Sequence, residues 1–285
     1  MPIEIKHASY TYFPGTIFES LALQDFSLQI DDGDYVGIMG KTGCGKSTLI
    51  QLIAGLMPPL EGQIIIDGKD INARDYPREE LRRKVGIVFQ YPEVQLFETS
   101  VEKDVAFGLR HSGLSKTTIA ENVRWAIETV GLDFEAIRAE SPFSLSGGEK
   151  RRVAIAGVLA AKPKILILDE PIVGLDPRGR AAFLELTTHL NAAGVTIIMV
   201  SHNADAIAEN AQRVIVLEDG RLLINAPAKH AFRDVALLQE KGIGISPARE
   251  MAHLLSACGH PIPQDTIRYQ ELLPFLINIG KGASR

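Results

Sequence analysis

A glycine-rich segment with the pattern G-x-x-x-x-G-K-S constrains this 285-residue chain more than any other feature. It covers residues 40–47, follows the apolar run Tyr35 to Met39, and leads into a second apolar run at 49–54. Glycines let successive backbone N–H groups face one point, and a helix that begins there adds the positive end of its dipole. The strand, loop and helix start therefore predict a P-loop that binds a nucleoside triphosphate.

The P-loop pattern also assigns roles to single residues. Lys46 is expected to reach the terminal phosphates, and the Ser47 hydroxyl is expected to ligate Mg²⁺. Cys44 has two interpretations: a residue small enough for the loop, or a thiol whose pKa is lowered by the helix N-terminus. The expected nucleotide-binding residues of the loop are Gly40, Lys41, Thr42, Gly43, Cys44, Gly45, Lys46, Ser47 and Thr48.

Composition limits the classes of partner. The formal net charge is −5 and the sequence pI is about 5.8, so the total charge shows no basic footprint for nucleic acid. The only cysteines are Cys44 and Cys258, and one lies in the phosphate loop, which indicates a reducing compartment. No uncharged apolar run approaches the ~18–20 residues of a spanning helix. We expect a soluble chain without a signal peptide, whose membrane role would need a spanning partner.

Apolar runs along the chain predict an α/β fold. Strands are expected at 3–13, 23–30, 35–39, 64–66, 85–89, 165–168, 195–200 and 214–217. Asp67-Gly68 predicts a tight hairpin turn, so antiparallel strands accompany a parallel sheet. A helical pattern from Ser100 to Gly131 suggests an inserted helical subdomain, at about 91–160. Proline and glycine become frequent after Asn225, which divides the chain into a domain at 1–225 and a helical extension at 226–285.

A second group of residues, Leu145-Ser146-Gly147-Gly148-Glu149, precedes a helix that is predicted from Lys150 to Ala161. A capping box explains Ser146 as the N-cap and Glu149 three residues later. It does not explain Gly147 and Gly148, since each glycine in a helix costs up to about 1 kcal/mol relative to alanine. Bare N–H groups at a helix N-terminus suit a phosphate that approaches closely.

With these motifs the sequence resembles the ATP-binding subunits of ABC transporters. Residues 145–149 resemble the family's LSGGQ signature, with Glu149 where glutamine is more usual. The P-loop, Gln90, the run 165–170 and His202 follow the family's order, and the resemblance covers about residues 3–224. It implies a P-loop NTPase (RecA-like) core with an antiparallel β subdomain, an inserted helical subdomain and a small C-terminal tail domain.

The resemblance implies roles for particular residues in binding ATP and Mg²⁺. Tyr12 stacks on the adenine, with Tyr10 and Phe13 as rival candidates. Glu170 is the catalytic base, and His202 contacts the γ-phosphate. The implied metal shell is Ser47, Gln90 and Asp169; Asp176 belongs to the D-loop; and Ser146, Gly147, Gly148 and Glu149 contact ATP held by an opposite subunit. Ile172 and Val173 depart from the family's commoner small or polar pair.

A narrower resemblance concerns residues 90–97, which match the QxPxxQxF pattern of ATPases in energy-coupling factor (ECF) transporters and related cobalt and nickel importers. The opening residues 10–19 are similar to the second ATPase component of such modules. This implies a peripheral subunit on the cytoplasmic face of the membrane, in a heterodimer or homodimer with a second ABC ATPase. The implied membrane partners are a transmembrane coupling subunit and a substrate-binding subunit.

Other classes of P-loop protein fit less well. An ABC ATPase acting on DNA would carry a long coiled coil between Thr48 and Leu145, and no heptad array is present there. A signalling GTPase or a small-molecule kinase would leave residues 145–149 without a role. Within transport, the ATPase of another importer for cobalt, nickel or biotin remains the alternative to a vitamin-type module.

Overall fold

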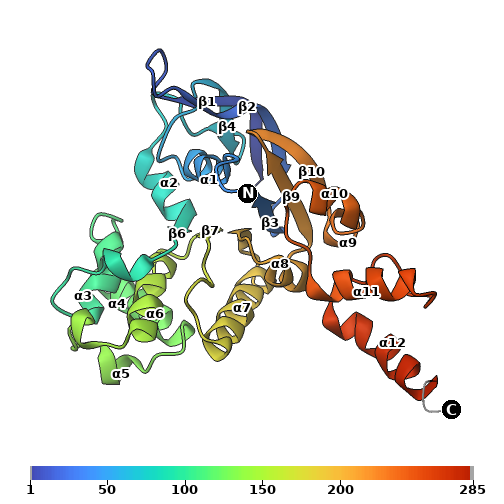
Figure 1. Cartoon of the computed structure of the whole chain (residues 1–285). Coiled ribbons are helices and arrows are strands. Elements are labelled where there is room, and N and C mark those ends of the chain that lie inside the picture. The colour runs from blue at the N-terminus through green and yellow to red at the C-terminus, as the bar shows by residue number, and fades with distance from the viewer. Residues whose placement is uncertain (1, 283–285) are drawn as a thin grey trace.

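The chain, described over residues 2–282 by a computed structural model, is built around a six-stranded sheet with the order β10-β9-β3-β8-β7-β6 (Figure 1). The strands are β3 (Tyr35–Gly40), β6 (Val85–Val88), β7 (Ile165–Asp169), β8 (Thr196–Val200), β9 (Arg213–Glu218) and β10 (Arg221–Pro227). All pairs from β9 to β6 are parallel, and β10 closes one edge as an antiparallel strand. The carboxyl ends of the parallel strands therefore meet along one edge.

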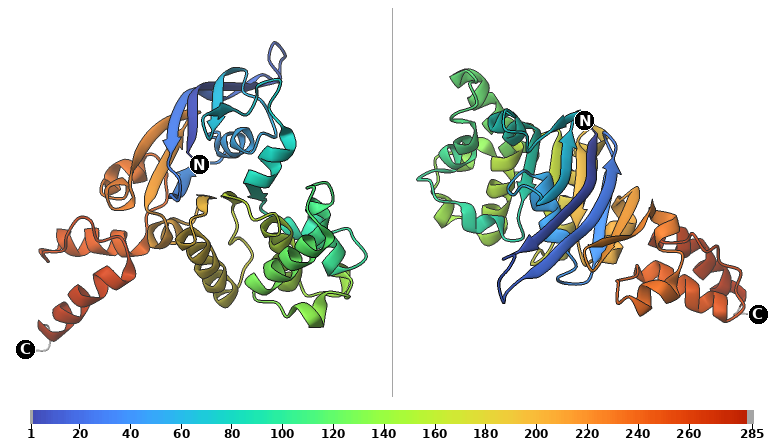
Figure 2. Two further views of the ribbon diagram at one scale, coloured as in Figure 1. Left: turned by 180° about the vertical axis from the view of Figure 1, so that it is seen from behind. Right: turned by 90° about the horizontal axis from the view of Figure 1, so that it is seen from above.

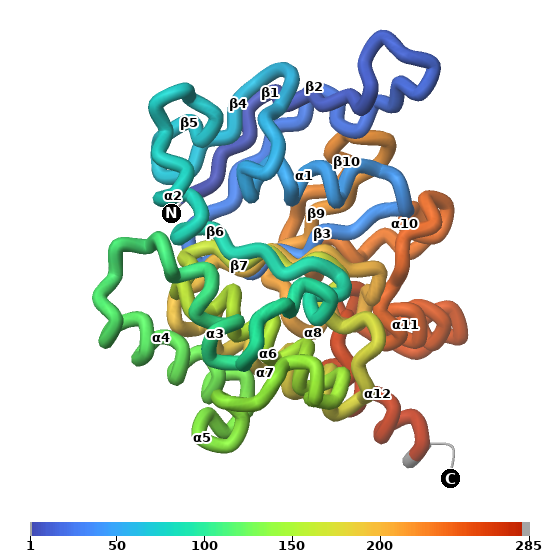
Figure 3. Tube along the Cα trace, turned by 90° about the vertical axis from the view of Figure 1, so that its left-hand side faces the viewer, coloured from blue at the N-terminus to red at the C-terminus, as the bar shows by residue number. Residues whose placement is uncertain are grey.

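Both faces of this sheet are buried, which explains its uninterrupted apolar runs. Along β7, Ile165 and Ile167 pack into one core and Leu166 and Leu168 into the other, because successive side chains point to opposite faces. One core is shared with α1 (Lys46–Ile53) and the second sheet, and the other is shared with α6 (Gly147–Leu159) and α8 (Ala204–Asn210). Figure 3 shows these layers on the two sides of the sheet.

The second sheet is antiparallel, with the order β2-β1-β4-β5. Its strands are β1 (Ile3–Tyr12), β2 (Ser20–Ile30), β4 (Glu61–Ile66) and β5 (Lys69–Asp70). Asp67 and Gly68 join β4 to β5 with φ values of 56° and 74°, as a two-residue hairpin with two left-handed positions requires. The expected hairpin is confirmed.

Helices between β6 and β7 form a separate body beside the sheet (Figure 1). They are η1 (Pro92–Gln95), α3 (Val101–Ala106), η2 (Phe107–Leu109), α4 (Lys116–Thr129), α5 (Phe134–Ile137), η3 (Pro142–Ser144) and α6. Val101 and Val105 of α3 and Val123 and Ile127 of α4 are buried together with Val153 of α6. The helix α2 (Arg78–Lys84) leads into β6. The predicted insertion of helices into the sheet is present.

The last part of the chain is helical and lies at the end of the molecule opposite the inserted helices (Figure 2). It follows β10 and contains α9 (Ala228–Ala231), α10 (Val235–Glu240), α11 (Pro247–Ala257) and α12 (Tyr269–Gly282). The helix α7 (Pro177–Ala192) lies earlier in the chain, between β7 and β8. Ala248, Ala252, Ile262 and Leu272 form a small core of their own. Arg268 donates from Nε to the carbonyl of Ala208 at 3.0 Å and ties this unit to α8.

The expected fold class is confirmed: a mixed α/β P-loop core with an antiparallel sheet, inserted helices and a C-terminal helical unit. The signature helix begins at Gly147 rather than at Lys150, because Ser146 caps it directly. The expected division at 225 and 226 stays a prediction, and its outermost residues, 1 and 283–285, lie outside the described part. Across residues 2–282, the helices are too short or too polar to cross a bilayer.

Candidate functional site

The phosphate loop connects β3 to α1, and its shape depends on glycine. Gly40 and Gly45 have φ values of 146° and 104°. A Cβ at Gly40 would lie 2.4 Å from the carbonyl oxygen of Leu217, and one at Gly45 would lie 2.3 Å from that of Ala22. No side chain caps α1 at Gly45, so the N–H groups of its first turn remain available to an anion.

The side chain of Lys46 is hydrogen-bonded to the backbone of the phosphate loop. The residue is 7% exposed, and its Nζ donates to the carbonyls of Gly40 and Lys41, both at 2.8 Å. The Cys44 thiol lies 3.9 Å from the same ammonium group. Burial nevertheless raises the pKa of Cys44 above its usual value, although Lys46 opposes the shift. The interpretation of Cys44 as a thiol with a lowered pKa is therefore wrong, and the residue packs in the core.

Two carboxylates stand at the carboxyl end of β7. Glu170 has φ = 47°, and its side chain is 12% exposed. Its Oε1 accepts from the backbone N–H of His202 at 2.9 Å, and its Oε2 accepts from Ser201 Oγ at 3.3 Å. His202 Nε2 lies 3.6 Å from Oε1. These contacts hold the Glu170 carboxylate against the turn that follows β8.

Asp169, the last residue of β7, is partly buried. Burial raises the pKa of Asp169, and the charge of Glu170 adds to the shift. Lys46 and His202 oppose it, which shows that the four groups act on one another electrostatically. A cation bound between these carboxylates would favour their charged forms and so oppose this shift of the pKa.

One cleft of about 590 Å³ gathers most of the expected nucleotide-binding residues, but Gly40, Lys41 and Cys44 do not line it. Its lining comprises Tyr12, Ser20, Leu21, Ala22, Thr42, Gly43, Gly45, Lys46, Ser47, Thr48, Gln90, Asp169, Glu170, Val173, Val200 and His202. Of the three aromatic candidates, Tyr12 lines the cleft, and its hydroxyl lies 3.1 Å from Thr48 Oγ1. Tyr10 packs edge-on against Tyr12 at 5.0 Å, and Phe13 is 65% exposed. Neither lines the cleft.

The donor set in this cleft suits Mg²⁺. Ser47, Gln90 and Asp169 offer oxygen atoms, which Mg²⁺ prefers, and they come from three different segments. Among residues 2–282 there is no group of three or more His, Cys, Asp or Glu side chains that would hold a metal. A magnesium ion would therefore need phosphate oxygens and water as further ligands, which is its usual mode in nucleotide sites.

The signature residues lie outside this cleft. Ser146 caps α6: its Oγ accepts from Glu149 N at 3.4 Å, while Glu149 Oε2 accepts from Ser146 N at 2.9 Å. The hydrogen bonds from Ser146 lower the pKa of Glu149. The predicted capping box is confirmed. Gly147 and Gly148 are exposed, and a Cβ at either would meet nothing within 4 Å.

A larger cleft of about 780 Å³ separates α6 from α7. Gly148 and Asp176 line it, but no P-loop residue does. Asp176 is the N-cap of α7 and accepts from Gly179 N at 2.7 Å. We assign the nucleotide to the smaller cleft, because groups suited to base, phosphate and metal converge only there among the described residues.

Sequence reasoning missed Ser201. This residue is fully buried, and its Oγ links the Glu170 carboxylate to the N–H of Asn203 at 3.1 Å. It therefore holds the turn that carries His202. The only signal in the sequence was its place between a buried strand and His202, which does not distinguish a supporting hydroxyl from a strand-end cap.

Comparison with known proteins agrees with this geometry. The family model for ABC transporters matches residues 23–173. The energy-coupling factor transporter ATP-binding proteins EcfA2 of Clostridium acetobutylicum and Symbiobacterium thermophilum are 42% and 44% identical, each alignment covering 100% of both chains.

Solved structures agree as well. CbiO1 of Clostridium perfringens, described as part of the ABC transporter complex cbiONQ, superimposes with a TM-score of 0.72 at 35% identity, over 89% of this chain and 98% of that one. The ATP-binding cassette MJ0796, a dimer bound to ADP and Pi, superimposes with a TM-score of 0.70 at 30% identity, over 79% and 98%. The chain therefore belongs to the ABC transporter family, as an ATP-binding subunit of the energy-coupling factor type.

Proposed function

We propose that this chain binds and hydrolyses ATP to drive uptake of a micronutrient, a vitamin or a transition metal ion, through an ECF-type importer. One observation carries the proposal. The P-loop, Gln90, both carboxylates and His202 share a single cleft, whereas the signature glycines are exposed outside it. One chain thus carries both parts of an ATPase site, the nucleotide cleft and the signature segment, but the two parts do not meet within the chain.

Within the cleft, different residues bind the base, the phosphates and the metal, and activate the water. Tyr12 stacks on the adenine, and Lys46 with the loop amides binds the phosphates. Ser47, Gln90 and Asp169 would hold Mg²⁺, which neutralises phosphate charge when it is bound. Glu170 orients and deprotonates the attacking water. The Ser201 hydroxyl and the backbone N–H of His202 hold the Glu170 carboxylate in place for this role. The His202 imidazole faces the γ-phosphate.

The exposed signature segment completes the site of a second ABC ATPase. Ser146, Gly147 and Gly148 present the start of α6, where unhindered N–H groups and the helix dipole favour a phosphate. Two subunits would close head to tail over two nucleotides, with Asp176 near the shared boundary. The dimeric form described for the cassette MJ0796 supports this arrangement. We favour a heterodimer, with a homodimer as the alternative.

In a transporter, the helical body would be the part of this chain that contacts the membrane partners. Tyr91, Val94, Phe97 and Phe107 are 45–78% exposed, and the Phe97 and Phe107 rings meet edge to face at 4.7 Å. This exposed apolar surface suits docking of a transmembrane coupling subunit. A substrate-binding membrane subunit would complete an assembly in which this chain is peripheral, on the cytoplasmic face.

A role on DNA is disfavoured by the segment between the P-loop and the signature. Its longest helix is α4, with 14 residues, so it contains no coiled-coil arm. The net charge of −5 also offers no overall attraction for a polyanion.

The test is ATP hydrolysis by the native membrane complex carrying Glu170→Gln. We expect turnover to fall at least about a hundredfold, because general-base catalysis contributes about 10²–10⁴-fold, while ATP binding is retained. Glu121→Gln, an exposed change on α4, should leave turnover unchanged and controls for the lost charge. Unchanged turnover in Glu170→Gln would remove this residue from the mechanism. Identifying the co-purifying subunits and the bound micronutrient tests the transport assignment separately.

A further inference from the structure

Arg151 of α6 is a buried cation that none of the roles above uses. It is 5% exposed and lies five residues after Ser146 on the same helix. Its guanidinium donates to three backbone carbonyls on other segments: to Val173 at 2.8 Å, to Pro171, and to Gln90 at 3.4 Å. Charged donors make stronger hydrogen bonds than neutral ones, so these contacts join three segments firmly.

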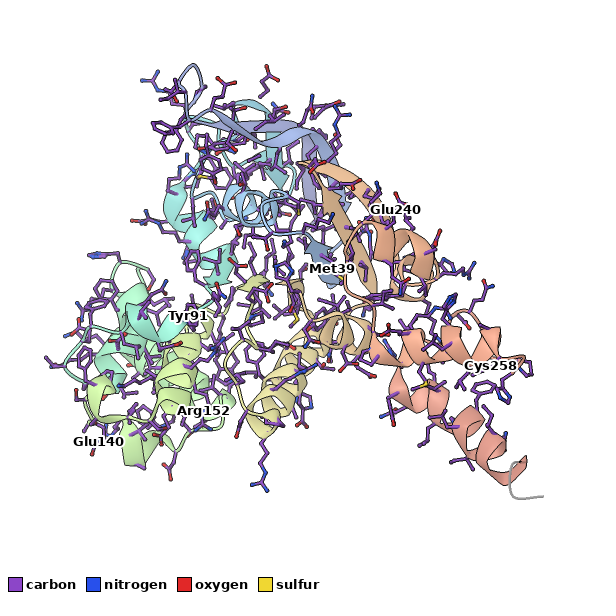
Figure 4. The ribbon with its side chains drawn as sticks, in the orientation of Figure 1. Met39, Tyr91, Glu140, Arg152, Glu240 and Cys258 are labelled. Carbon is purple, nitrogen blue, oxygen red and sulfur yellow. The ribbon has the colours of Figure 1, made fainter. Side chains whose placement is uncertain are left out.

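All three carbonyls belong to segments that shape the nucleotide cleft. Gln90 follows β6 and lines the cleft, Pro171 directly follows Glu170, and Val173 lines the cleft beside Glu170. Figure 4 shows Tyr91 and Arg152, the chain neighbours of Gln90 and Arg151, together in the helical body beside the sheet. The guanidinium therefore lies between the helix that carries the signature and the residues that surround the γ-phosphate.

A carboxylate near Arg151 adds a second observation. Glu93 lies in η1, which packs against α6, and its charge acts on the guanidinium. Burial lowers the pKa of Arg151, and Glu93 and Tyr91 oppose that shift. In the part of the chain that the structure describes, Arg151 Nε and Glu93 Oε2 are both buried without a hydrogen-bond partner. Arg151 and Glu93 thus have one hydrogen-bond donor and one acceptor available where η1 packs against α6.

We propose that Arg151 is a positioning residue that couples the chain's own nucleotide cleft to its signature segment. Its three hydrogen bonds hold α6 at a fixed orientation relative to Gln90 and to the loop after Glu170. Nucleotide bound in the cleft contacts those two segments. Through Arg151 it then determines the position of Ser146 and the glycine pair relative to the nucleotide of the opposite subunit. The free Nε and the Glu93 carboxylate allow the guanidinium to stay paired if α6 turns. The inference rests on the proposed function.

Two measurements on Arg151→Gln test the coupling. The first is steady-state ATP hydrolysis by the intact transporter, and the second is ATP binding to the subunit in the Glu170→Gln background, where nucleotide is not consumed. We expect kcat to fall about tenfold or more while the Kd for ATP stays within about twofold, because the P-loop is untouched. The ATP concentration needed for dimer formation should rise about tenfold.

Two further variants separate positioning from folding. Arg151→Lys keeps the charge but cannot reach three carbonyls at once, so its kcat should lie between those of the wild type and Arg151→Gln. Arg124→Gln removes an arginine of α4 whose ion pairs, with Glu128 and Glu135, lie within the helical body, and it should leave both measurements unchanged.

Several results would overturn the inference. One is a kcat for Arg151→Gln within twofold of the wild type, and another is a loss of ATP affinity as large as the loss of kcat. A third is Arg151→Lys being no more active than Arg151→Gln. In each case Glu170→Gln still reports on the proposed function, since its effect does not depend on Arg151.

Discussion

The two glycine-rich segments of this protein differ in what they require from the chain itself. In the P-loop, Gly40 and Gly45 have left-handed backbone angles and face carbonyl oxygens so closely that a Cβ cannot fit. In the signature, Gly147 and Gly148 lie within a regular helix, and a Cβ on either would meet open space. The fold of the chain requires glycine at positions 40 and 45, whereas nothing in the chain's own packing requires glycine at positions 147 and 148.

This difference shows where the ligand of each segment comes from. The P-loop is shaped by contacts inside one chain, so its anion site exists before any partner arrives. The signature glycines lower helix stability without an internal compensation, because glycine in a helix costs up to about 1 kcal/mol relative to alanine. A ligand that approaches from outside would explain such a position, and we propose that this ligand is the nucleotide of the opposite subunit.

Gly45→Ala should give the largest effect. The added Cβ would lie 2.3 Å from the Ala22 carbonyl at φ = 104°, so the loop must shift. We expect unfolding free energy to fall by about 1–3 kcal/mol. ATP affinity should fall by about a hundredfold, as for the loss of one or two charged hydrogen bonds. Denaturant unfolding and equilibrium ATP binding measure both quantities.

The matched control for that change is Gly33→Ala. Gly33 also has a left-handed angle, φ = 78°, but a Cβ there meets nothing within 4 Å, and the residue lies outside the nucleotide cleft. It should lose stability and keep its ATP affinity. If Gly45→Ala bound ATP as well as Gly33→Ala did, the P-loop glycines would not be needed for phosphate binding.

Gly148→Ala should act in the opposite sense on stability. We expect the unfolding free energy to rise by up to about 1 kcal/mol, because alanine favours the helix. Hydrolysis by the assembled complex should fall about tenfold, since the methyl group blocks the approach of phosphate, and ATP binding by the isolated subunit should not change. Gly157→Ala, later on α6 with its nearest contact at 3.9 Å, should also stabilise but leave hydrolysis intact. Equal activity of the two variants would contradict the assignment.

Glu149→Gln should have the smallest effect. The amide oxygen can still accept from Ser146 N, so turnover at pH 7 should stay within about twofold. The pKa of Glu149 is lowered from its usual value of 4.5, so its contribution to stability is full above that pH and is lost as pH falls through the lowered value. The stability advantage of the wild type over the variant should therefore shrink between pH 6 and pH 3, as unfolding experiments at both ends would show.

Much of the fold and site followed from local patterns. Asp67-Gly68 allowed a hairpin to be predicted, and the uninterrupted apolar run before Asp169 indicated a strand buried on both faces. Other features depend on residues far apart in sequence. Ser201 and Glu170 are 31 residues apart, and Arg151 reaches a carbonyl 61 residues away. No periodicity or motif spacing encodes such contacts, because they depend on how β6, β7, β8 and α6 pack.

The P-loop and the capped glycine pair could be predicted from the amino-acid sequence, since both depend on backbone preferences within a few residues. The packing of the folded chain was needed to show that Tyr12 rather than Tyr10 or Phe13 lines the cleft, and that Cys44 is buried with a raised thiol pKa. It was also needed to show that the signature stands apart from its own P-loop. These outcomes depend on which side chains face one another across the sheet, and that is set by packing of the whole chain.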